Sequence, residues 1–584
     1  MCFPCCLFMV CVHVCLLPFP LLFFSFFFFF FLWSSAKCRC SGAAGHRGHW
    51  VGVCHRRNGR QGGMSCKAVR VAIALSGGVD SAVAALFLRR CVPHWGDVEA
   101  LWRLERPLAL CEVVEALEQQ RPLSEVVALA PATGNSHDPA AAVNYFPLFM
   151  KNWDDAFESD GVGRSWCEAA QEDYNDATDV ARALGLLHIR EVLPLHNYSA
   201  CYVEKCFQPM LDAYARGATL NVDVLCNEEV KFLALLDALL TAGRAAYLAT
   251  GHYARTVHFP LLSCENAAPT SLRVIARPFS ARNDLNDQTV FLSRLSKRQT
   301  LRAIFPLGHV FERKSDVRAV AEHFGMKRIS TKKTSTGLCF VGEHYRRAGR
   351  GGSCAGGFRS FLEEYMAPNC TALQKLTAAG QQTTFINAEN GDVVEASGLA
   401  LHGDDDGVLL PAYSLTIGQL VRGKSEDGKM MRYYVQGKKL FSFRENCNKG
   451  DNEDDDGGYV RHLHTVWLVD RWDHPLLYGK VAKIYDVKLS VHPQWLGNRE
   501  GSVRLHCRCC ARHQEPLRPA LICFDWSDVS EKNGCIRVAT ATVLFEEPVR
   551  ALTPGQALVA YISFSKEGAE DAAGWFVVAS GWIA

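Results

Sequence analysis

The stretch from Val69 to Ser81 constrains this chain more than any other, because it predicts a strand, a tight turn and a helix in direct succession. Its first part is apolar and β-branched, as a buried strand of a parallel sheet is. Ser76-Gly77-Gly78 then allows a sharp turn that a ligand can approach closely, and Asp80-Ser81 begins a helix. Such a turn presents free N–H groups and the positive end of the helix dipole to one point. We therefore expect a phosphate to bind there.

This loop is not a Walker A motif, because the Gly-Lys-Ser/Thr ending is absent. It resembles the SGGxDS pyrophosphate loop of the PP-loop ATPases, which cleave ATP between the α and β phosphates and adenylate a carbonyl oxygen. The alternative is an ordinary glycine-rich turn between a strand and a helix. The resemblance implies ATP, with Mg²⁺, as the cofactor. It also implies a set of nucleotide-binding residues in the loop, namely Ala74, Leu75, Ser76, Gly77, Gly78, Val79, Asp80 and Ser81.

Length, charge and cysteine usage set broad limits on the protein. Its 584 residues are enough for two or more domains. The formal net charge is +2, so any surface that binds nucleic acid must be a local basic patch. The 25 cysteines are odd in number and lack the spacing of a disulfide scaffold. We interpret most of them as reduced core residues of an intracellular protein.

Residues 1–65 form a leader that we exclude from the fold. Met1 to Trp33 is almost wholly apolar, and no acidic residue occurs before Asp80. A membrane anchor or signal sequence is one interpretation, although no positive segment precedes the apolar run. A second is that Met64 is the true start. The third, which we prefer, is a mitochondrial presequence, with the cytoplasm as the alternative location and no stable membrane partner.

Residues 66–345 alternate predicted strands and helices, which indicates an α/β domain with a parallel sheet and a ligand at the carboxyl ends of its strands. The further strands are expected at Tyr145–Met150, His188–Leu193 and Ala245–Thr250, and a helix at 166–186. Residues 91–144 are expected to form an inserted helical hairpin to which we assign no chemistry.

Six motifs follow in order, and together they resemble the tRNA-specific 2-thiouridylases, bacterial and mitochondrial. They are LFMKNWDD, DVLCNEEVKF, ATGHYAR, NDQTVFLSRL, FPLG and STGLCFVGE. The resemblance implies a sulfurtransferase of the PP-loop superfamily that thiolates the C2 position of the wobble uridine in tRNAs of the Lys, Glu and Gln type.

Two cysteines lie in these motifs, and each taken alone is more simply a buried core cysteine. Cys226 is expected at the N-terminus of an amphipathic helix, where the dipole and Lys231 would lower its pKa. Lys332 and Lys333 would similarly favour a thiolate at Cys339. By resemblance, Cys339 carries the persulfide and Cys226 is the nucleophile that releases the sulfur. A Cys226–Cys339 disulfide then forms, so a persulfide donor and a reductant are needed from outside the chain.

Further site residues are implied by the resemblance alone. ATP would also contact Met150 and Gly251, each of which has a plainer interpretation as core or turn. The predicted tRNA contacts are Asn221, Val222, Asp223, His252, Asn286, Asp287, Gln288 and Gln556. The family has lysine where Asn286 stands and proline where Val222 stands, which removes one phosphate-binding charge and loosens one loop. An arginine–tyrosine contact of the family is not kept near Cys510, and Arg508 and Arg512 are the nearest basic residues.

The second half predicts two β-rich parts. Residues 346–475 are expected to form a small central domain with an acidic loop at 451–458, which would repel tRNA. Residues 476–584 are expected to form a β-barrel that binds tRNA. Three cysteines at 507, 509 and 510 lie beside two histidines, but their spacing is wrong for zinc, and we predict no metal site.

Two other functions are compatible with parts of the sequence. Another PP-loop enzyme, one that modifies tRNA differently or is an amidating synthetase, would not need two separate reactive cysteines. A catalytically silent tRNA-binding protein would not need the intact SGGVDS loop.

Overall fold

The computed structural model describes residues 68–129, 137–153, 168–258, 272–282, 286–332, 382–394, 400–401, 412–424, 430–445, 459–496, 501–532, 534–563 and 574–584. All of them belong to the unit Ser65–Ala584. The leader, Cys339 with its loop, and the acidic run at 451–458 lie outside the described residues. Among these residues, every helix is too short or too polar to cross a bilayer.

A five-stranded sheet in the order β3-β2-β1-β4-β7 carries the predicted phosphate loop. β1 (Val69–Ala74) pairs in parallel with β2 (Val143–Lys151) and with β4 (Tyr247–Ala249). The edge strands are β3 (Leu195–Asn197) and β7 (Ala303–Ile304), both also parallel. All carboxyl ends therefore lie along one edge, where open α/β sheets bind their ligands.

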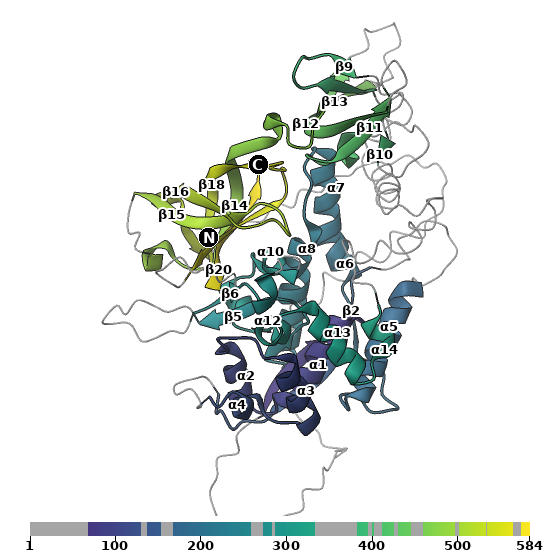
Figure 1. Ribbon diagram of the computed structural model, residues 1–584, viewed down its shortest axis with the longest axis vertical. Coiled ribbons are helices and arrows are strands. Elements are labelled where there is room, and N and C mark those ends of the chain that lie inside the picture. The colour runs from purple at the N-terminus through teal and green to yellow at the C-terminus, as the bar shows by residue number, and fades with distance from the viewer. Residues whose placement is uncertain are drawn as a thin grey trace, which may run out of the picture. The chain divides into compact units, whose positions relative to one another are not determined.

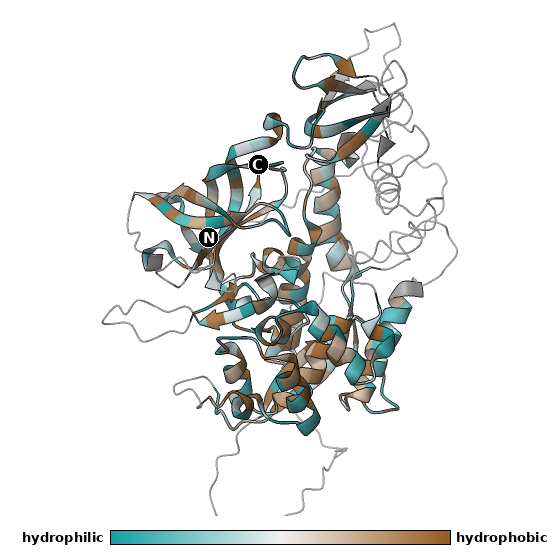
Figure 2. Ribbon diagram, viewed as in Figure 1, coloured by the Kyte–Doolittle hydropathy of each residue, from teal (hydrophilic) through white to brown (hydrophobic). Residues whose placement is uncertain are grey.

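Helices cover this sheet and close its core. α1 (Val79–Cys91) is buried along nearly its whole length because it consists largely of Ala, Val, Leu and Phe. Its neighbours in the same apolar core include α13 (Lys314–His323) and α5 (Glu168–Ala183) (Figure 1). Figure 2 shows the ribbon of α1 mostly in hydrophobic colours, whereas α5 carries hydrophilic residues along much of its length.

Two predictions for this domain were wrong. Where the structure describes this segment, at 91–129 and 137–144, the chain forms not a hairpin but three helices, α2 (Trp95–Trp102), α3 (Leu110–Gln119) and α4 (Leu123–Val126), which bury Trp95 and Leu117 in the main core. The strand expected at His188–Leu193 lies at Leu195–Asn197 instead. Residues 188–191 form a turn, in which the N–H of Glu191 bonds the His188 carbonyl and the Glu191 carboxylate accepts the His188 N–H. Ile189 and Val192 are consequently exposed.

The remaining helices of the domain are short. They are α6 (Ser199–Tyr202), α7 (Gln208–Ala215), α8 (Val222–Leu225), α9 (Leu236–Thr241), α10 (Thr289–Leu292), α11 (Lys297–Thr300), α12 (Pro306–Val310) and α14 (Lys327–Ser330). Two π-helical segments, η2 (Val203–Phe207) and η3 (Cys226–Leu235), continue α6 and α8 without a break.

The central β-rich part is a six-stranded sheet in the order β10-β11-β12-β13-β8-β9. Its strands are β8 (Gln382–Asn387), β9 (Val393–Val394), β10 (Ala400–Leu401), β11 (Leu420–Lys424), β12 (Met430–Glu445) and β13 (Tyr459–Val469). Phe385, Leu415, Val435 and Val466 form its core.

The C-terminal part is a closed antiparallel barrel, as predicted. The strands run β14-β18-β16-β15-β19-β20, and β20 pairs back onto β14. They are β14 (Tyr478–Leu489), β15 (Ser502–Cys510), β16 (Arg518–Asp525), β18 (Cys535–Arg550), β19 (Ala557–Ser563) and β20 (Trp575–Ile583), with a short β17 (Ser530–Lys532) on β18. The hairpin of β5 (Arg255–His258) and β6 (Arg273–Ala276) extends this sheet through Phe576 and Ala276. The sequence gives no sign of this junction between the two domains.

Candidate active site

The phosphate loop is held in shape by contacts that only glycine permits. Gly77 has φ +74°, and a Cβ on it would lie 2.3 Å from the Asp173 carbonyl oxygen of α5. The Ser81 hydroxyl then fastens the loop to the helix: it accepts the Ser76 N–H at 3.1 Å and donates to the Gly78 carbonyl at 3.0 Å. The first N–H groups of α1 have no partner within a helix, so the loop keeps the anion-binding geometry that its sequence predicted.

Asp80 anchors the start of α1 to a distant part of the chain. Its carboxylate accepts the Tyr253 hydroxyl at 2.8 Å and pairs with Lys314 at 3.1 Å. The N–H of Tyr253 in turn bonds the Gln288 side-chain oxygen at 2.8 Å. The segment that carries Gln288 is therefore linked to the phosphate loop through one tyrosine.

Gly251 and His252 end the neighbouring strand β4 beside the loop. A Cβ on Gly251 would lie 2.7 Å from the Asp80 carbonyl carbon and from the Ser81 nitrogen, so glycine lets this turn pack onto the start of α1. The His252 Nδ1 lies 2.7 Å from the Thr250 hydroxyl. Burial lowers the pKa of His252 well below its usual value, and Lys231 lowers it further. His252 is thus held neutral, and its contact with tRNA stays a prediction.

Lys332 also reaches the loop. Its Nζ lies 3.3 Å from the Gly77 carbonyl oxygen, 2.5 Å from Asp173 and 2.7 Å from Asp176. Burial raises the pKa of Asp173 despite this pairing. The lysine that was expected to favour a Cys339 thiolate is therefore engaged with two carboxylates on α5.

Cys226 lies within a helix rather than at its N-terminus. α8 begins at Val222, and Asn221 is the N-cap, its side chain accepting the Asp223 N–H at 3.2 Å. Cys226 follows α8 directly and is 7% exposed. It packs in a cluster with Trp153, Tyr202 and Val230. The prediction of a lowered thiol pKa was wrong, because burial raises the pKa of Cys226 to about 11.

The ionisable groups around Cys226 change its pKa in opposite directions, on top of the larger effect of burial. Lys231 lowers the pKa of the thiol, while Asp223 and Cys201 raise it. Burial also raises the pKa of Asp223 to about 6, although Lys231 opposes this. A buried thiol beside a carboxyl group with a raised pKa marks a candidate functional site. The Asn152 amide nitrogen donates to the Cys226 sulfur at 3.7 Å.

Sheet register brings these groups to the edge that carries the phosphate loop. The N–H of Leu75 bonds the Leu148 carbonyl at 2.9 Å, which aligns the loop with the end of β2. Met150 lies near that end, partly buried between two apolar clusters. Asn152 follows β2 and touches Cys226. The sites predicted for ATP and for the nucleophile are thereby neighbours on one sheet edge.

The other predicted tRNA contacts are engaged within the chain. Asp287 is buried and accepts from Arg277 at 2.5 Å and from the Thr289 hydroxyl at 2.6 Å. Gln556 donates to the Thr219 carbonyl at 2.7 Å. Asn286 is half-buried, as are Asn221 and Asp223, whereas Val222 is buried. Their contacts with tRNA stay predictions.

Of the two substitute arginines, Arg508 is exposed, with its guanidinium 5.0 Å from the centre of the Trp575 ring. Arg512 bonds the Ala551 carbonyl at 3.0 Å.

Sequence reasoning missed a buried ionic cluster two residues beyond Cys226. The Glu228 carboxylate pairs with Arg294 at 2.6 Å and with Lys488 of the barrel strand β14. Arg294 also pairs with Asp486 at 2.5 Å. Burial by itself raises the pKa of Glu228, but Arg294 and Lys488 outweigh it and hold that pKa below its usual value. No local pattern could have found this cluster, because its members come from three distant segments.

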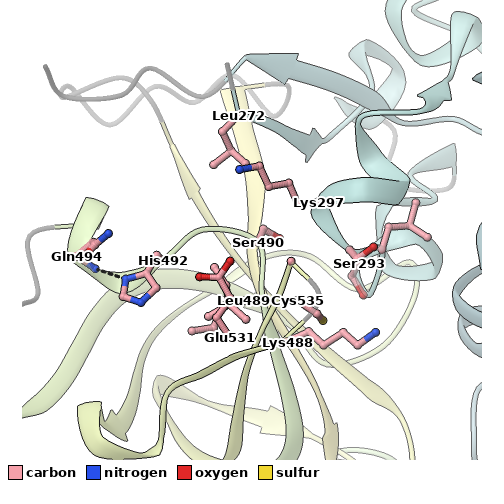
Figure 3. A pocket seen from close by; sticks show the side chains of 14 residues that line it. Leu272, Ser293, Lys297, Lys488, Leu489, Ser490, His492, Gln494, Glu531 and Cys535 are labelled. Carbon is pink, nitrogen blue, oxygen red and sulfur yellow. Dashed lines mark hydrogen bonds between the residues drawn. The ribbon is translucent and has the colours of Figure 1, made fainter. Parts of the chain in front are cut away.

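A cavity of about 130 Å³ opens beside this cluster. Figure 3 shows Ser293 and Lys297 on the α10–α11 side of the cavity and Lys488, Leu489 and Ser490 on the barrel side. Its lining includes no residue of the phosphate loop and none of the groups around Cys226. It is a separate feature of the junction between the domains.

Within the described part of the chain, one group of residues has the spacing of a metal site: Glu389, Asp470 and His474. The His474 Nε2 lies 2.7 Å from the Glu389 carboxylate, and its Nδ1 accepts the Leu476 N–H at 3.2 Å. A neutral imidazole has one lone pair, and here a backbone N–H uses it. The contacts therefore favour an ordinary hydrogen-bonded histidine. The sulfur atoms of Cys507 and Cys509 lie 3.6 Å apart inside the barrel.

Comparison with known proteins gives a consistent result. Residues 139–343 match the family model described as the tRNA methyl transferase HUP domain, a span that includes Cys226 and Cys339. The chain is 30% identical over 415 residues to the tRNA-specific 2-thiouridylase MnmA of Bacillus cereus, covering 71% of this chain and 84% of the relative. The identity is also 30%, over 414 residues and with the same coverage, to the proteins of that name from Bacillus licheniformis and Halalkalibacterium halodurans.

Proposed function

The chain belongs to the family of tRNA-specific 2-thiouridylases, and from this premise we propose that it is an ATP-dependent tRNA-uridine 2-sulfurtransferase acting on the wobble uridine. The observation that carries the proposal is the neighbourhood of two sites on one sheet edge. Leu75 beside Leu148 fixes the phosphate loop, and Asn152 beyond the same strand touches Cys226. An activating nucleotide and a sulfur-handling thiol need to act on the same base, and this edge offers both.

The loop fits a nucleotide by its own construction. Gly77 and Gly78 expose backbone at the start of α1, and Ser76 to Ser81 form a closed hydrogen-bonded turn around it. Bound ATP, with Mg²⁺ as its usual companion, supplies the adenylyl group that makes the C2 oxygen of uracil a leaving group. Lys332 lies beside the Gly77 carbonyl, and Asp173 and Asp176 already pair with its charge.

Cys339 can reach the same place by chain length alone. Lys332 is fixed at the loop, and Cys339 lies seven positions further along the sequence. Seven extended residues span at most about 25 Å. This tether supports the role of Cys339 as the persulfide carrier.

The proposed sulfur transfer then runs between the two cysteines. The terminal sulfur of the Cys339 persulfide attacks C2 of the activated base, and the C2 oxygen leaves with AMP. Cys226, as a thiolate, attacks the Cys339 sulfur, so that the S–S bond of the persulfide breaks and its terminal sulfur stays on C2. The two cysteines end as a disulfide, which an external reductant must return to two thiols. The persulfide itself comes from an external donor.

The partner tRNAs would be those of the Lys, Glu and Gln type, by family resemblance, and the proposed location is the mitochondrion. The experiment is a reaction of the full chain with unmodified tRNA, ATP and a persulfide donor, followed by mass spectrometry of the nucleosides. We expect 2-thiouridine that depends on ATP and disappears in Cys226→Ser and in Cys339→Ser. Thiolation that persists in both variants would contradict the proposal. Depletion in cells, with separate analysis of mitochondrial and cytosolic tRNA, tests the location.

A further inference from the structure

Asn152 belongs to the LFMKNWDD motif, but the family resemblance assigns it no role, and its side chain lies beside Cys226. It follows β2 directly at the carboxyl edge of the sheet. The residues on both sides of it are held in place. The Lys151 carbonyl accepts the Tyr198 N–H at 2.8 Å, and the Trp153 ring packs edge-on against the Phe207 ring, with 5.0 Å between the ring centres. Both chain neighbours of Asn152 are therefore anchored by contacts, which restricts where Asn152 can lie.

The two polar atoms of this side chain have different surroundings. The amide nitrogen donates to the Cys226 sulfur at 3.7 Å. The carbonyl oxygen is fully buried and, among the described residues, has no hydrogen-bond partner. A buried acceptor without a partner costs about 1–3 kcal/mol, and native proteins rarely leave one without a reason. One reason is that the partner is a ligand.

The chemistry of the reaction tells which ligand group fits. The reacting carbon of uracil, C2, is bonded to N3, which carries a hydrogen. A base that brings C2 to the Cys226 region therefore brings an N–H donor to the same place. Cytosine, by contrast, has an unprotonated N3, whose lone pair would face the Asn152 oxygen.

We propose that Asn152 is a catalytic and specificity-determining residue: its amide N–H donates to the sulfur of Cys226 as a thiolate, and its carbonyl oxygen accepts the N3–H of the target uracil. This inference rests on the proposed function. The hydrogen bond from the Asn152 amide stabilises the charged sulfur, which burial otherwise disfavours. The acceptor half selects uracil over cytosine, because a site built to bond a particular N–H rejects a base that lacks it.

The test combines a protein change with a base change. Thiolation is measured with tRNA that carries uridine or 3-deazauridine at the wobble position, because the second base replaces N3–H by C–H. For the unaltered enzyme we expect kcat/KM to fall about 10- to 100-fold with 3-deazauridine. For Asn152→Ala, kcat/KM with uridine should already be lower by a similar factor, and the further loss with 3-deazauridine should be less than about threefold.

A second variant separates the two halves of the proposal. Asn152→Asp keeps an oxygen acceptor but replaces the donor to sulfur, so discrimination against 3-deazauridine should persist. Alkylation of Cys226 by iodoacetamide should then require a higher pH than in the unaltered enzyme, a shift that a merely structural role would not cause. Asn390→Ala, an exposed asparagine in the turn after β8, is the matched control and should behave as the unaltered enzyme does.

Each outcome decides one claim. Absence of 2-thiouridine with the unaltered enzyme overturns the proposed function and this inference with it. Thiolation by the unaltered enzyme, with an equal loss on 3-deazauridine in Asn152→Ala, overturns the inference alone. Should Asn152→Ala fail to fold, Asn152→Asp decides by the same base comparison and the pH profile of alkylation.

Discussion

The phosphate loop and the cluster around Cys226 share one sheet edge but are built in different ways. The loop is made by its own sequence: a strand, two glycines and a hydroxyl that bonds across five residues. The Cys226 cluster is made by residues far apart in the chain, among them Asn152, Tyr202 and Lys231. The comparison teaches that anion binding is encoded locally here, whereas the reactivity of the sulfur is encoded by tertiary packing.

The largest effect is expected where the loop packs closely against a distant segment, α5. Gly77→Ala places a Cβ 2.3 Å from the Asp173 carbonyl oxygen in a backbone with φ +74°. The loop must move, and a displacement of this kind lowers activity at least about 100-fold. Nucleotide binding, measured by equilibrium dialysis, should be lost together with thiolation.

Gly243→Ala is the control for this change. Gly243 also has a positive φ, but nothing lies within 4 Å of a Cβ there. Only the conformational penalty of about 1 kcal/mol remains. Retained nucleotide binding in Gly77→Ala would show that the loop is not shaped by this contact.

The next largest effect tests whether the helix that carries Cys226 and Glu228 is stabilised by its contacts with the barrel. Glu228→Gln leaves Arg294 and Lys488 buried without their shared carboxylate. Breaking a buried ion pair from one side costs about 3–5 kcal/mol, which chemical denaturation would measure. Glu112→Gln breaks an exposed pair with Arg106 and should change the free energy of unfolding by less than about 1 kcal/mol. Equal effects of the two variants would mean that the ion pairs with the barrel do not stabilise the helix that carries Cys226.

A smaller effect on the free energy of unfolding, opposite in sign to that of Glu228→Gln, is expected from neutralising Asp223. Its pKa is raised from 3.8 to about 6 in the folded protein. The stabilisation from protonated Asp223 is complete below about pH 4 and is lost as the pH rises through about 6. Asp223→Asn should therefore stabilise the protein at pH 7, by at most about 3 kcal/mol, and should give no gain at pH 4. Thermal unfolding at both pH values checks this, and a gain of equal size at pH 4 would contradict it.

The smallest effect concerns the charge that opposes burial of the thiol. Lys231 lowers the pKa of Cys226 and bonds Asn227 at 2.9 Å. In Lys231→Met the pKa of Cys226 should rise above about 11, so that alkylation at a fixed pH slows about three- to tenfold. Lys205→Met, which removes an exposed lysine paired with Glu204, is the control. An unchanged rate of alkylation would mean that Lys231 does not affect the pKa of Cys226.

The same contrast explains what the sequence could and could not predict. The strand, the glycine turn and the start of α1 were predicted to within about two residues, because their geometry depends on neighbours in the sequence. The pKa of Cys226 was predicted in the wrong direction, because burial by Tyr202 and Trp153 has no local signal. The prediction of a strand at His188–Leu193 was wrong for a related reason. The Glu191 carboxylate accepts the His188 N–H, and this hydrogen bond closes a turn there. No role was predicted for Glu228, because its partners lie in the 286–300 segment and in the barrel.

The central claim is that the loop and the two cysteines act on one base. The most direct measurement is a single turnover of the full chain, loaded with persulfide and given tRNA and ATP without reductant. The account predicts one Cys226–Cys339 disulfide, found by peptide mass spectrometry, for each 2-thiouridine formed, and neither product without ATP. Formation of 2-thiouridine while both cysteines remain unlinked would contradict it.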